Sequence, residues 1–250
     1  MSNDRIARRR QRLALEHFVR EGLIAGLNAT SGREVHFLQI GGNDGVTADP
    51  LRSWHSREPW SGAIVEPVPA YFEKLRELHA DNDRLKLLNC AVSDRAGELT
   101  LWLVDPAQSA RYPAWTQGLA SIRLDHLVRH NVAPEHCTSV VVPCVTPSEL
   151  CRSLDMKTLD LLCVDVEGHE LAILEAFPFT RVPVAVTIFE AWHMSLSARS
   201  ALSAHLAPGG MSVVFLGEDG IIVSSKDAVR LSFLESLALY LAKFDVEPRL

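Results

Sequence analysis

The stretch Gln39-Ile40-Gly41-Gly42-Asn43-Asp44-Gly45 begins inside an apolar run at residues 35–40 and continues past its end. Further apolar runs occur at residues 63–66, 85–92, 159–166, 184–190 and 211–216, with helical periodicity between most of them. Alternation of apolar runs with helices predicts a parallel sheet that is covered on both faces. The quoted stretch is therefore predicted to leave the first strand of a doubly wound α/β sheet.

Both ends of the chain depart from this alternation. Residues 211–216 and 221–224 are separated only by Gly217-Glu218-Asp219-Gly220, which predicts a hairpin and an antiparallel strand at the end of the sheet. Residues 4–27 predict an amphipathic helix with Leu15, Phe18, Val19, Gly22 and Leu23 on one apolar face. We expect an N-terminal helical extension over residues 1–30 and a single domain over residues 31–250.

Composition excludes several classes of protein. Of the 250 residues, 47% are hydrophobic and 22% are charged, unlike collagen-like or largely disordered chains. No run approaches the roughly 20 uncharged residues that cross a bilayer, and the apolar run near the N-terminus does not fit a signal peptide. These features predict a cytoplasmic protein without membrane contact. The net charge of −6 argues against general nucleic-acid binding, although six arginines lie within residues 1–20.

The glycine loop predicts the floor of a nucleoside site, because ligands of open parallel sheets bind at the carboxyl ends of strands. The G-x-G-x-x-G spacing of dinucleotide sites is absent, and Asp44 would place negative charge where phosphate lies. A cationic ligand without phosphate, such as the sulfonium of S-adenosylmethionine, fits better. Glu66, which ends the next strand, is placed to accept hydrogen bonds from ribose hydroxyls. The alternatives are a plain strand-ending turn for the loop and a helix-capping carboxylate for Glu66.

Acidic residues and histidines follow two later strands. The segment from Asp165 to Glu170 contains three acids and a histidine, and Phe189-Glu190-Ala191-Trp192-His193 ends the next strand. Asp165 and Glu190 are predicted at neighbouring strand tips, where they would share a divalent cation such as Mg²⁺. Alternatively, His193, His169 or a carboxylate is a general base, or the histidines are only surface or capping residues.

Together these segments resemble the FkbM-type methyltransferases. The resemblance covers about residues 35–215 and rests on five ordered motifs, namely residues 39–45 followed by Asp49-Pro50, residues 65–69, Ala120-Ser121, residues 165–170, and Phe189-Glu190 with His193. It implies a class I, Rossmann-like, S-adenosylmethionine-dependent methyltransferase that usually methylates a hydroxyl of a sugar, polyketide or other small natural product. The resemblance places the methionine part against Gly41, Asn43, Asp44 and Gly45, and the ribose against Glu66. We also expect Pro67, Ala91 and Ser121 to bind the cofactor.

The sequence departs from the resemblance at three positions. Gln39 stands where many members of the wider superfamily have an acid that pairs with the amino group of the cofactor. Gly42 replaces a more usual alanine, and His169 stands where small or aromatic residues are often found. His169 is therefore expected to reflect a particular substrate.

An aliphatic hydroxyl needs a base or a Lewis acid before it accepts a methyl group. We predict His193 as this base, with Asp165, Glu167 and Glu190 positioning the acceptor or holding a cation. The loop that contains Tyr112 and Trp115 is the predicted substrate wall. Two other readings compete: a noncatalytic cofactor-binding or scaffold protein, and a methyltransferase acting on a nucleic acid or peptide. The N-terminal helix is the segment expected at a homodimer contact.

Overall fold

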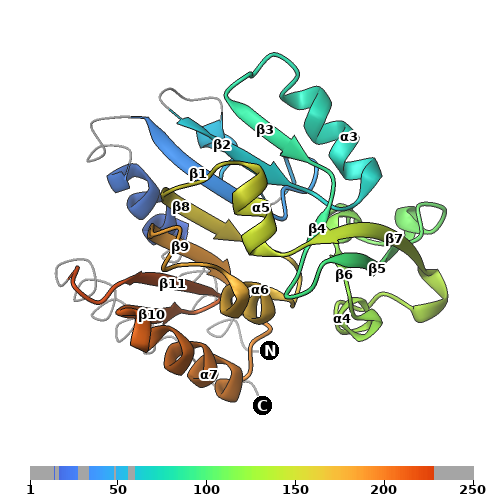
Figure 1. Ribbon diagram of the computed structural model, residues 1–250. Coiled ribbons are helices and arrows are strands. Elements are labelled where there is room, and N and C mark those ends of the chain that lie inside the picture. Colours follow the sequence, from blue (N-terminus) through green and yellow to red (C-terminus); the bar gives the residue numbers. More distant parts are fainter. Residues whose placement is uncertain (1–13, 15–16, 28–33, 48, 56–59, 228–250) are drawn as a thin grey trace.

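Seven strands form the larger sheet of the structure, a computed structural model that describes residues 14, 17–27, 34–47, 49–55 and 60–227. Their order across the sheet is β10-β11-β9-β8-β1-β2-β3 (Figure 1). The neighbours from β9 to β3 pair in parallel. All six residues of β8 are buried, as expected for a parallel strand covered on both faces. The strands are β1 (Val35–Ile40), β2 (Trp60–Val65), β3 (Leu85–Leu88), β8 (Leu159–Val164), β9 (Val184–Glu190), β10 (Met211–Leu216) and β11 (Asp219–Ser224).

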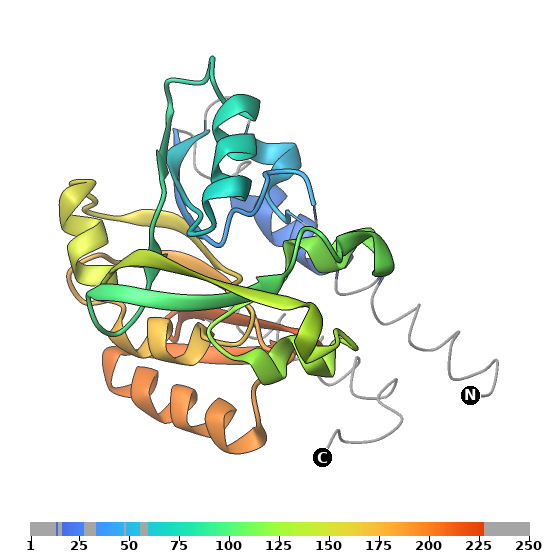
Figure 2. The ribbon, with the colours of Figure 1, turned by 90° about the vertical axis from the view of Figure 1, so that its right-hand side faces the viewer.

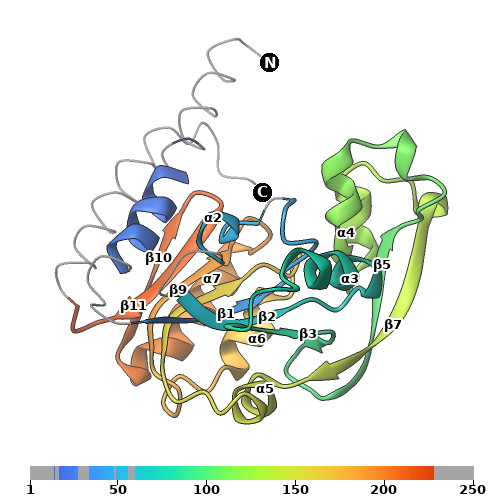
Figure 3. The same ribbon diagram turned by 90° about the horizontal axis from the view of Figure 1, so that it is seen from above.

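Helices cover both faces of this sheet (Figure 3). One apolar core contains Ile24, Trp54 and Leu75, which come from the helix over residues 17–27, from α2 (Arg52–His55) and from α3 (Pro69–Leu78). A second core packs Leu150, Leu174 and Leu202 against the other face, from α5 (Pro147–Ser153), α6 (Glu170–Ala176) and α7 (Leu196–Leu206). The predicted mostly parallel, doubly wound α/β fold is confirmed.

The helix over residues 17–27 buries a different face from the predicted one. Val19, Ile24 and Leu27 are buried, whereas Phe18 is 72% exposed and Gly22 is exposed. Val19, Ile24 and Leu27 pack into the core under the larger sheet, and on the same helix the side chain of Arg20 lies 3.5 Å from Asp219 of β11. Most of the predicted extension, including Leu15 and residues 1–13, lies outside the described residues.

The predicted C-terminal hairpin forms, but its second strand is not at the edge. β11 pairs antiparallel with β10 on one side and antiparallel with β9 on the other. The edge position therefore belongs to β10, and β11 fills the space between β9 and β10. Sequence spacing predicts which strands form a hairpin, whereas the order across the sheet depends on which of them meets β9.

A second, smaller sheet lies over the ends of the first (Figure 2). Its order is β4-β7-β5-β6, in which β5 and β7 form a long antiparallel pair. The predicted strand over residues 85–92 is split, because Asn89 turns away to bond the carbonyls of Glu66 and Pro67 and β4 joins the second sheet. The strands are β4 (Ala91–Val92), β5 (Gly97–Val104), β6 (Ala120–Ser121) and β7 (Cys137–Val145).

The segment between β5 and β7 contains short helical turns and the helix α4 (Leu124–Arg129). The turns are η1 (Ser109–Arg111), η2 (Ala114–Gly118) and η3 (Pro134–His136), while η4 (Ala207–Gly209) follows α7. We call residues 105–136 the insertion. Across the described ranges, no helix is both long enough and apolar enough to pass through a bilayer.

Candidate cofactor and active site

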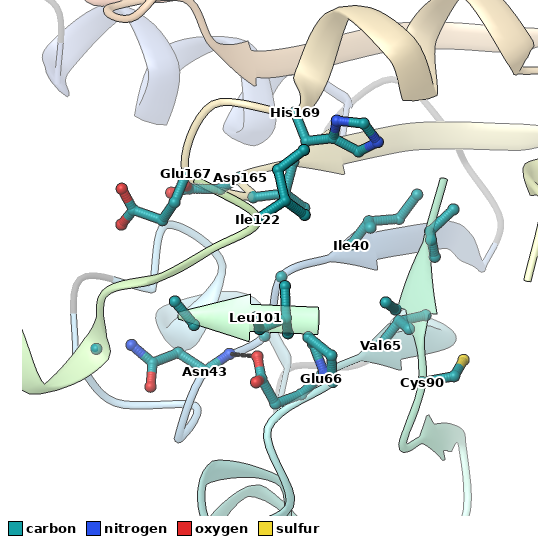
Figure 4. A pocket seen from close by; sticks show the side chains of 18 of the residues that line it. Ile40, Asn43, Val65, Glu66, Cys90, Leu101, Ile122, Asp165, Glu167 and His169 are labelled. Atoms are coloured by element: carbon teal, nitrogen blue, oxygen red, sulfur yellow. Dashed lines mark hydrogen bonds between the residues drawn. The ribbon is translucent and has the colours of Figure 1, made fainter. Parts of the chain in front are cut away.

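A pocket of about 810 Å³, partly open to solvent, lies where strands of the larger sheet end. Its walls come from both sheets and from the loops after β1, β2 and β8. Figure 4 shows Glu66 and Asn43 on one side of the pocket and Asp165, Glu167 and His169 on the other. The lining residues include Ile40, Gly41, Gly42, Asn43, Thr47, Asp49, Val65, Glu66, Pro67, Cys90, Ala91, Leu101, Gly118, Ile122, Asp165, Glu167 and His169.

The glycine loop is the floor of this pocket. Gly41 has φ +92°, and a Cβ there would lie 1.7 Å from the carbonyl oxygen of Asp165. The amides of Gly41 and Gly42 both donate to the carbonyl of Val65, at 2.9 and 3.0 Å. Asn43 also has a positive φ of 47°. The loop therefore needs glycine at position 41 so that the ends of β1 and β8 can come together.

Glu66 is 4% exposed and lies at the pocket wall. Its carboxylate accepts the amides of Asn43 and Val68, each at 2.8 Å. Burial raises the pKa of Glu66 to about 7, against the lowering effect of these two bonds. A buried carboxylate held by two backbone amides keeps its remaining lone pairs directed at the pocket, which suits a diol that donates two hydrogen bonds.

The other predicted cofactor residues fall into two groups. Pro67 and Ala91 line the pocket with Gly41, Asn43 and Glu66. Asp44, Gly45 and Ser121 are not among the lining residues. Each has a local role instead: Asp44 accepts the amides of Val46 and Thr47, Gly45 packs under α3, and Ser121 donates to the carbonyl of Glu167.

Asp49, part of the Asp49-Pro50 motif, is an acid at the pocket wall that was not among the predicted cofactor residues. The side-chain amide of Gln39 donates to Asp49 at 3.0 Å, and the amide of Leu51 donates to the same oxygen at 2.8 Å. Burial raises the pKa of Asp49. Gln39 is not an acid, but its side chain holds the carboxylate of Asp49 at this wall.

Three carboxyl groups meet behind the strand ends. Asp165, Glu170 and Glu190 each offer an oxygen within 4.8 Å of the others. Burial and repulsion from Glu190 raise the pKa of Asp165 well above its usual range, and burial raises the pKa of Glu190 to about 9. Glu170 is more firmly held, because it accepts the amides of Val166 and Gly168. The predicted neighbouring placement of Asp165 and Glu190 is therefore found, with Glu170 as a third member.

The predicted base, His193, does not line the pocket. Its Nε2 lies 3.3 Å from Glu190 and 4.0 Å from Glu167, and its side chain is 10% exposed. Burial and the neighbouring His126 lower the pKa of His193 to about 4, so the ring is neutral at neutral pH. Glu167, by contrast, does line the pocket and reaches His126 at 2.8 Å. Glu167 therefore lies between the pocket and the histidines.

The insertion contributes residues that the sequence reasoning missed. His126 and His130 come from the α4 region and lie beside His193, with ring centroids 4.2 Å and 5.6 Å from it. Gly118 and Ile122 line the pocket. Neither member of the predicted substrate wall does: Tyr112 bonds His136 at 2.6 Å, and Trp115 stands beside His130. The spacing of four residues between His126 and His130 was a signal present in the sequence.

His169 also lines the pocket. Its Nε2 shares a hydrogen bond of 2.8 Å with the hydroxyl of Ser93, and burial lowers the pKa of the ring. A neutral imidazole tied to Ser93 forms part of the wall above the glycine loop.

A doubly wound sheet with a glycine loop after its first strand and a buried acid after its second defines the class I, Rossmann-like methyltransferase architecture. The family model described as the methyltransferase FkbM domain matches residues 39–205, about two thirds of the chain. The chain therefore belongs to the FkbM methyltransferase family.

Solved structures of similar shape include the fibrillarin pre-rRNA processing protein of Methanococcus jannaschii, at 10% identity and a TM-score of 0.41 over 76% of this chain and 65% of that one. Methyltransferase FkbM from Methylobacillus flagellatus matches at 11% identity and a TM-score of 0.44 over 76% of this chain and 43% of that one. Aeropyrum pernix fibrillarin with natively bound S-adenosyl-L-methionine matches at 14% identity and a TM-score of 0.39, over 76% of this chain and 66% of that one. The chain thus spans less than two thirds of each of these proteins, and no curated protein matches it.

Proposed function

We propose that this protein transfers the methyl group of S-adenosylmethionine to a hydroxyl of a small molecule. The observation that carries the proposal is Glu66, a buried carboxylate 4% exposed at the wall of a pocket whose floor is the glycine loop. The residues present fit the cofactor. Glu66 accepts the ribose hydroxyls, and Asp49 beside Gln39 supplies the negative charge for the amino group.

The cofactor supplies an activated methyl group, so the chain mainly has to align the acceptor with it. Alignment of this kind contributes roughly 7–11 kcal/mol to catalysis. Asp165 and Glu167 line the pocket opposite Glu66, which makes them the acidic groups nearest an acceptor (Figure 4). We assign Glu167 and Asp165 to holding the acceptor hydroxyl, whereas His193 does not line the pocket and is given no part in this step.

The choice of a small acceptor follows from the shape and charge of the site. The second sheet covers the pocket with Leu99, Leu101 and Ile122, leaving a narrow, partly apolar space. The net charge of −6 opposes a nucleic-acid acceptor. A peptide or nucleic-acid acceptor, or a scaffold role without catalysis, remains the alternative to be tested.

Calorimetric titration with S-adenosylmethionine and S-adenosylhomocysteine tests the cofactor site. Both ligands are expected to bind the wild type, and Glu66→Gln is expected to weaken binding by about 1.5–3 kcal/mol, the usual cost of a hydrogen bond to a charged group. Glu77→Gln is the matched control, because Glu77 is an exposed acid on α3. Absence of binding by folded wild-type protein would remove the methyltransferase proposal.

Release of S-adenosylhomocysteine with hydroxylated small molecules, RNA and peptides as acceptors then separates the acceptor classes. Turnover with small molecules alone supports the proposal, and turnover with RNA or peptide alone contradicts it. Cofactor binding without turnover on any acceptor favours the scaffold alternative. Adding Mg²⁺ tests the predicted cation at Asp165 and Glu190. If a cation there assists the acceptor, added Mg²⁺ should raise turnover.

A further inference from the structure

Four side chains with metal-binding atoms meet beside the cofactor pocket. His126, His130, His193 and Glu167 each offer one ligand atom, and these four atoms all lie within 4.8 Å of one another. The side chains of His126 and His193 are 6% and 10% exposed, so this cluster is shielded from solvent. We call these four residues the histidine cluster.

The cluster is assembled from three segments that are distant in the sequence. His126 lies in α4 and His130, four positions later, is the residue that caps its C-terminal end, so the two rings lie about one helical turn apart. Glu167 follows β8, and His193 follows β9. Two histidines at this spacing on a helix, joined by ligands from elsewhere, are a common way to build a transition-metal site.

Two ring nitrogens of the cluster have no hydrogen-bond partner within the described part of the chain. The Nε2 atoms of His130 and His193 are both shielded from solvent. The closest acceptor to His193 Nε2 is Glu190, at 3.3 Å but outside hydrogen-bond geometry. Buried polar atoms are normally bonded, so each exception needs an explanation.

Ring packing alone does not explain the arrangement. The centroids of His126 and His193 are 4.2 Å apart, those of His126 and His130 are 4.8 Å apart, and Trp192 stacks nearby. Aromatic packing alone would favour contacts between ring carbon atoms and would leave the ring nitrogens free to face hydrogen-bond partners. Here the ring nitrogens converge with a carboxylate that reaches them from a residue with φ +57°, a backbone conformation that is costly for glutamate.

We infer that the histidine cluster binds a divalent transition-metal ion of the zinc class. Imidazole with one carboxylate is a donor set that Zn²⁺ and similar ions prefer, whereas Mg²⁺ prefers oxygen donors alone. Zn–N bonds of about 2.1 Å put tetrahedral ligands about 3.4 Å apart, so the four side chains would have to draw together slightly around the ion. His126 Nε2 and Glu167 Oε2 are 2.8 Å apart, a hydrogen-bond distance, so this pair would open to the ligand spacing while the more widely separated atoms draw in.

The ion would join the insertion to the larger sheet. His126 and His130 belong to the insertion, and Glu167 and His193 belong to loops that leave β8 and β9. Because Glu167 also lines the cofactor pocket, the ion fixes one pocket wall in place. A coordinated His193 has its lone pair on the metal, so the metal assignment excludes the predicted role of His193 as a base. This inference goes beyond the proposed methyl transfer and does not depend on it.

The test is a metal titration of the untagged, chelator-treated protein without S-adenosylmethionine. We expect one Zn²⁺ per chain in competition with a chromophoric chelator, and a tetrahedral ligand-field spectrum when Co²⁺ is used instead. His126→Ala and His130→Ala are each expected to weaken Zn²⁺ binding by about 100-fold or more, since loss of even an outer-shell partner costs about 10–100-fold. Circular dichroism checks that each variant is folded.

His205→Ala is the matched control, because His205 is an exposed histidine on α7, and it should bind Zn²⁺ as the wild type does. Glu167→Gln nearly preserves the shape of the side chain. Its Zn²⁺ affinity, which should also fall, therefore tests the site if the histidine variants do not fold. No Zn²⁺ bound by folded wild type, equal binding by all variants, or Mg²⁺ bound as tightly as Zn²⁺ would each overturn the inference. Cofactor binding is measured separately, so either result leaves the methyltransferase proposal to its own test.

Limited proteolysis gives an independent reading of the same ion. Cleavage within residues 105–136 should slow when Zn²⁺ is added to the wild type and stay unchanged in His130→Ala. Faster cleavage on adding Zn²⁺, or the same slowing in both proteins, would contradict a link between insertion and sheet.

Discussion

The cofactor cradle, which consists of the glycine loop and Glu66, and the histidine cluster border the same pocket but are built in opposite ways. In the cradle, Glu66 is bonded by the backbone of Asn43 and Val68, and the glycine loop is bonded by the carbonyl of Val65. In the cluster, His130 and His193 bring ring nitrogens together without such bonds. The cradle is therefore held by backbone hydrogen bonds, while two ring nitrogens of the cluster have no such bond within the described residues.

Gly41→Ala is the change with the largest expected effect on cofactor affinity. A Cβ at Gly41 would lie 1.7 Å from a backbone carbonyl, so β1 and β8 have to separate. We expect cofactor binding to be lost and the free energy of unfolding to fall by roughly 3 kcal/mol or more, measured by calorimetry and by urea unfolding.

Gly210→Ala is the control for backbone strain alone. Gly210 has φ +71°, but no atom lies within 4 Å of the added Cβ. Gly210→Ala should lower the free energy of unfolding by about 1 kcal/mol and leave cofactor affinity unchanged. Equal effects of the two substitutions would contradict a cradle that depends on close strand approach.

The pH dependence of cofactor affinity sharpens the role of Glu66. Its pKa is raised to about 7, so the group is protonated below that pH and accepts hydrogen bonds less well. Affinity for S-adenosylmethionine should rise with pH up to about 7 and fall about tenfold per unit below it. In Glu66→Gln the profile should be flat between about pH 6 and about pH 8, limits set by about one unit either side of that pKa. A wild-type profile that is equally flat would place the ribose elsewhere.

Asn89→Ala should weaken cofactor binding, because Asn89 holds the backbone of Glu66 and Pro67 in place. Asn89 donates to the carbonyls of Glu66 and Pro67, at 2.8 and 3.1 Å, where β3 passes into β4. Loss of these bonds should cost about 1 kcal/mol, or roughly fivefold in cofactor affinity. Calorimetry at one pH measures it, and an unchanged affinity would show that the cradle holds without this bond.

Thr146→Ala should change stability but not cofactor affinity. Thr146 and Glu149 form a capping box at the start of α5, and neither lines the pocket or belongs to the histidine cluster. The loss should be about 1 kcal/mol in the free energy of unfolding, read by urea unfolding. A parallel loss of cofactor affinity would mean that general destabilisation explains the effects predicted for the cradle.

Much of the cradle could be predicted from sequence because its chemistry is local. The order of apolar runs predicted the strands, and Gly41 and Glu66 each stand at the end of one of them. Strand ends of a parallel sheet meet at one edge, so position in the chain was enough to bring these residues together. The capping box at the start of α5 is likewise local, because Thr146 and Glu149 are only three positions apart.

Other predictions depended on how elements pack. The periodicity of residues 4–27 predicted a buried Phe18, but packing against α2 and β11 leaves it 72% exposed. Asp44 and Gly45 belong to the glycine loop, yet the local turn directs Asp44 to its own backbone neighbours. Propensity and periodicity describe one segment at a time, whereas burial is decided by what covers it.

The doubly wound sheet, the glycine loop and the acid at the second strand end could all be predicted without the structure. Each follows from residue order, because hydrophobic periodicity and strand direction are properties of the chain. Packing of the whole domain places β11 between β9 and β10 and brings His126 and His130 of the insertion to Glu167 and His193. These contacts of the insertion join residues 37 to 67 positions apart, and such long-range pairing does not follow from any local pattern.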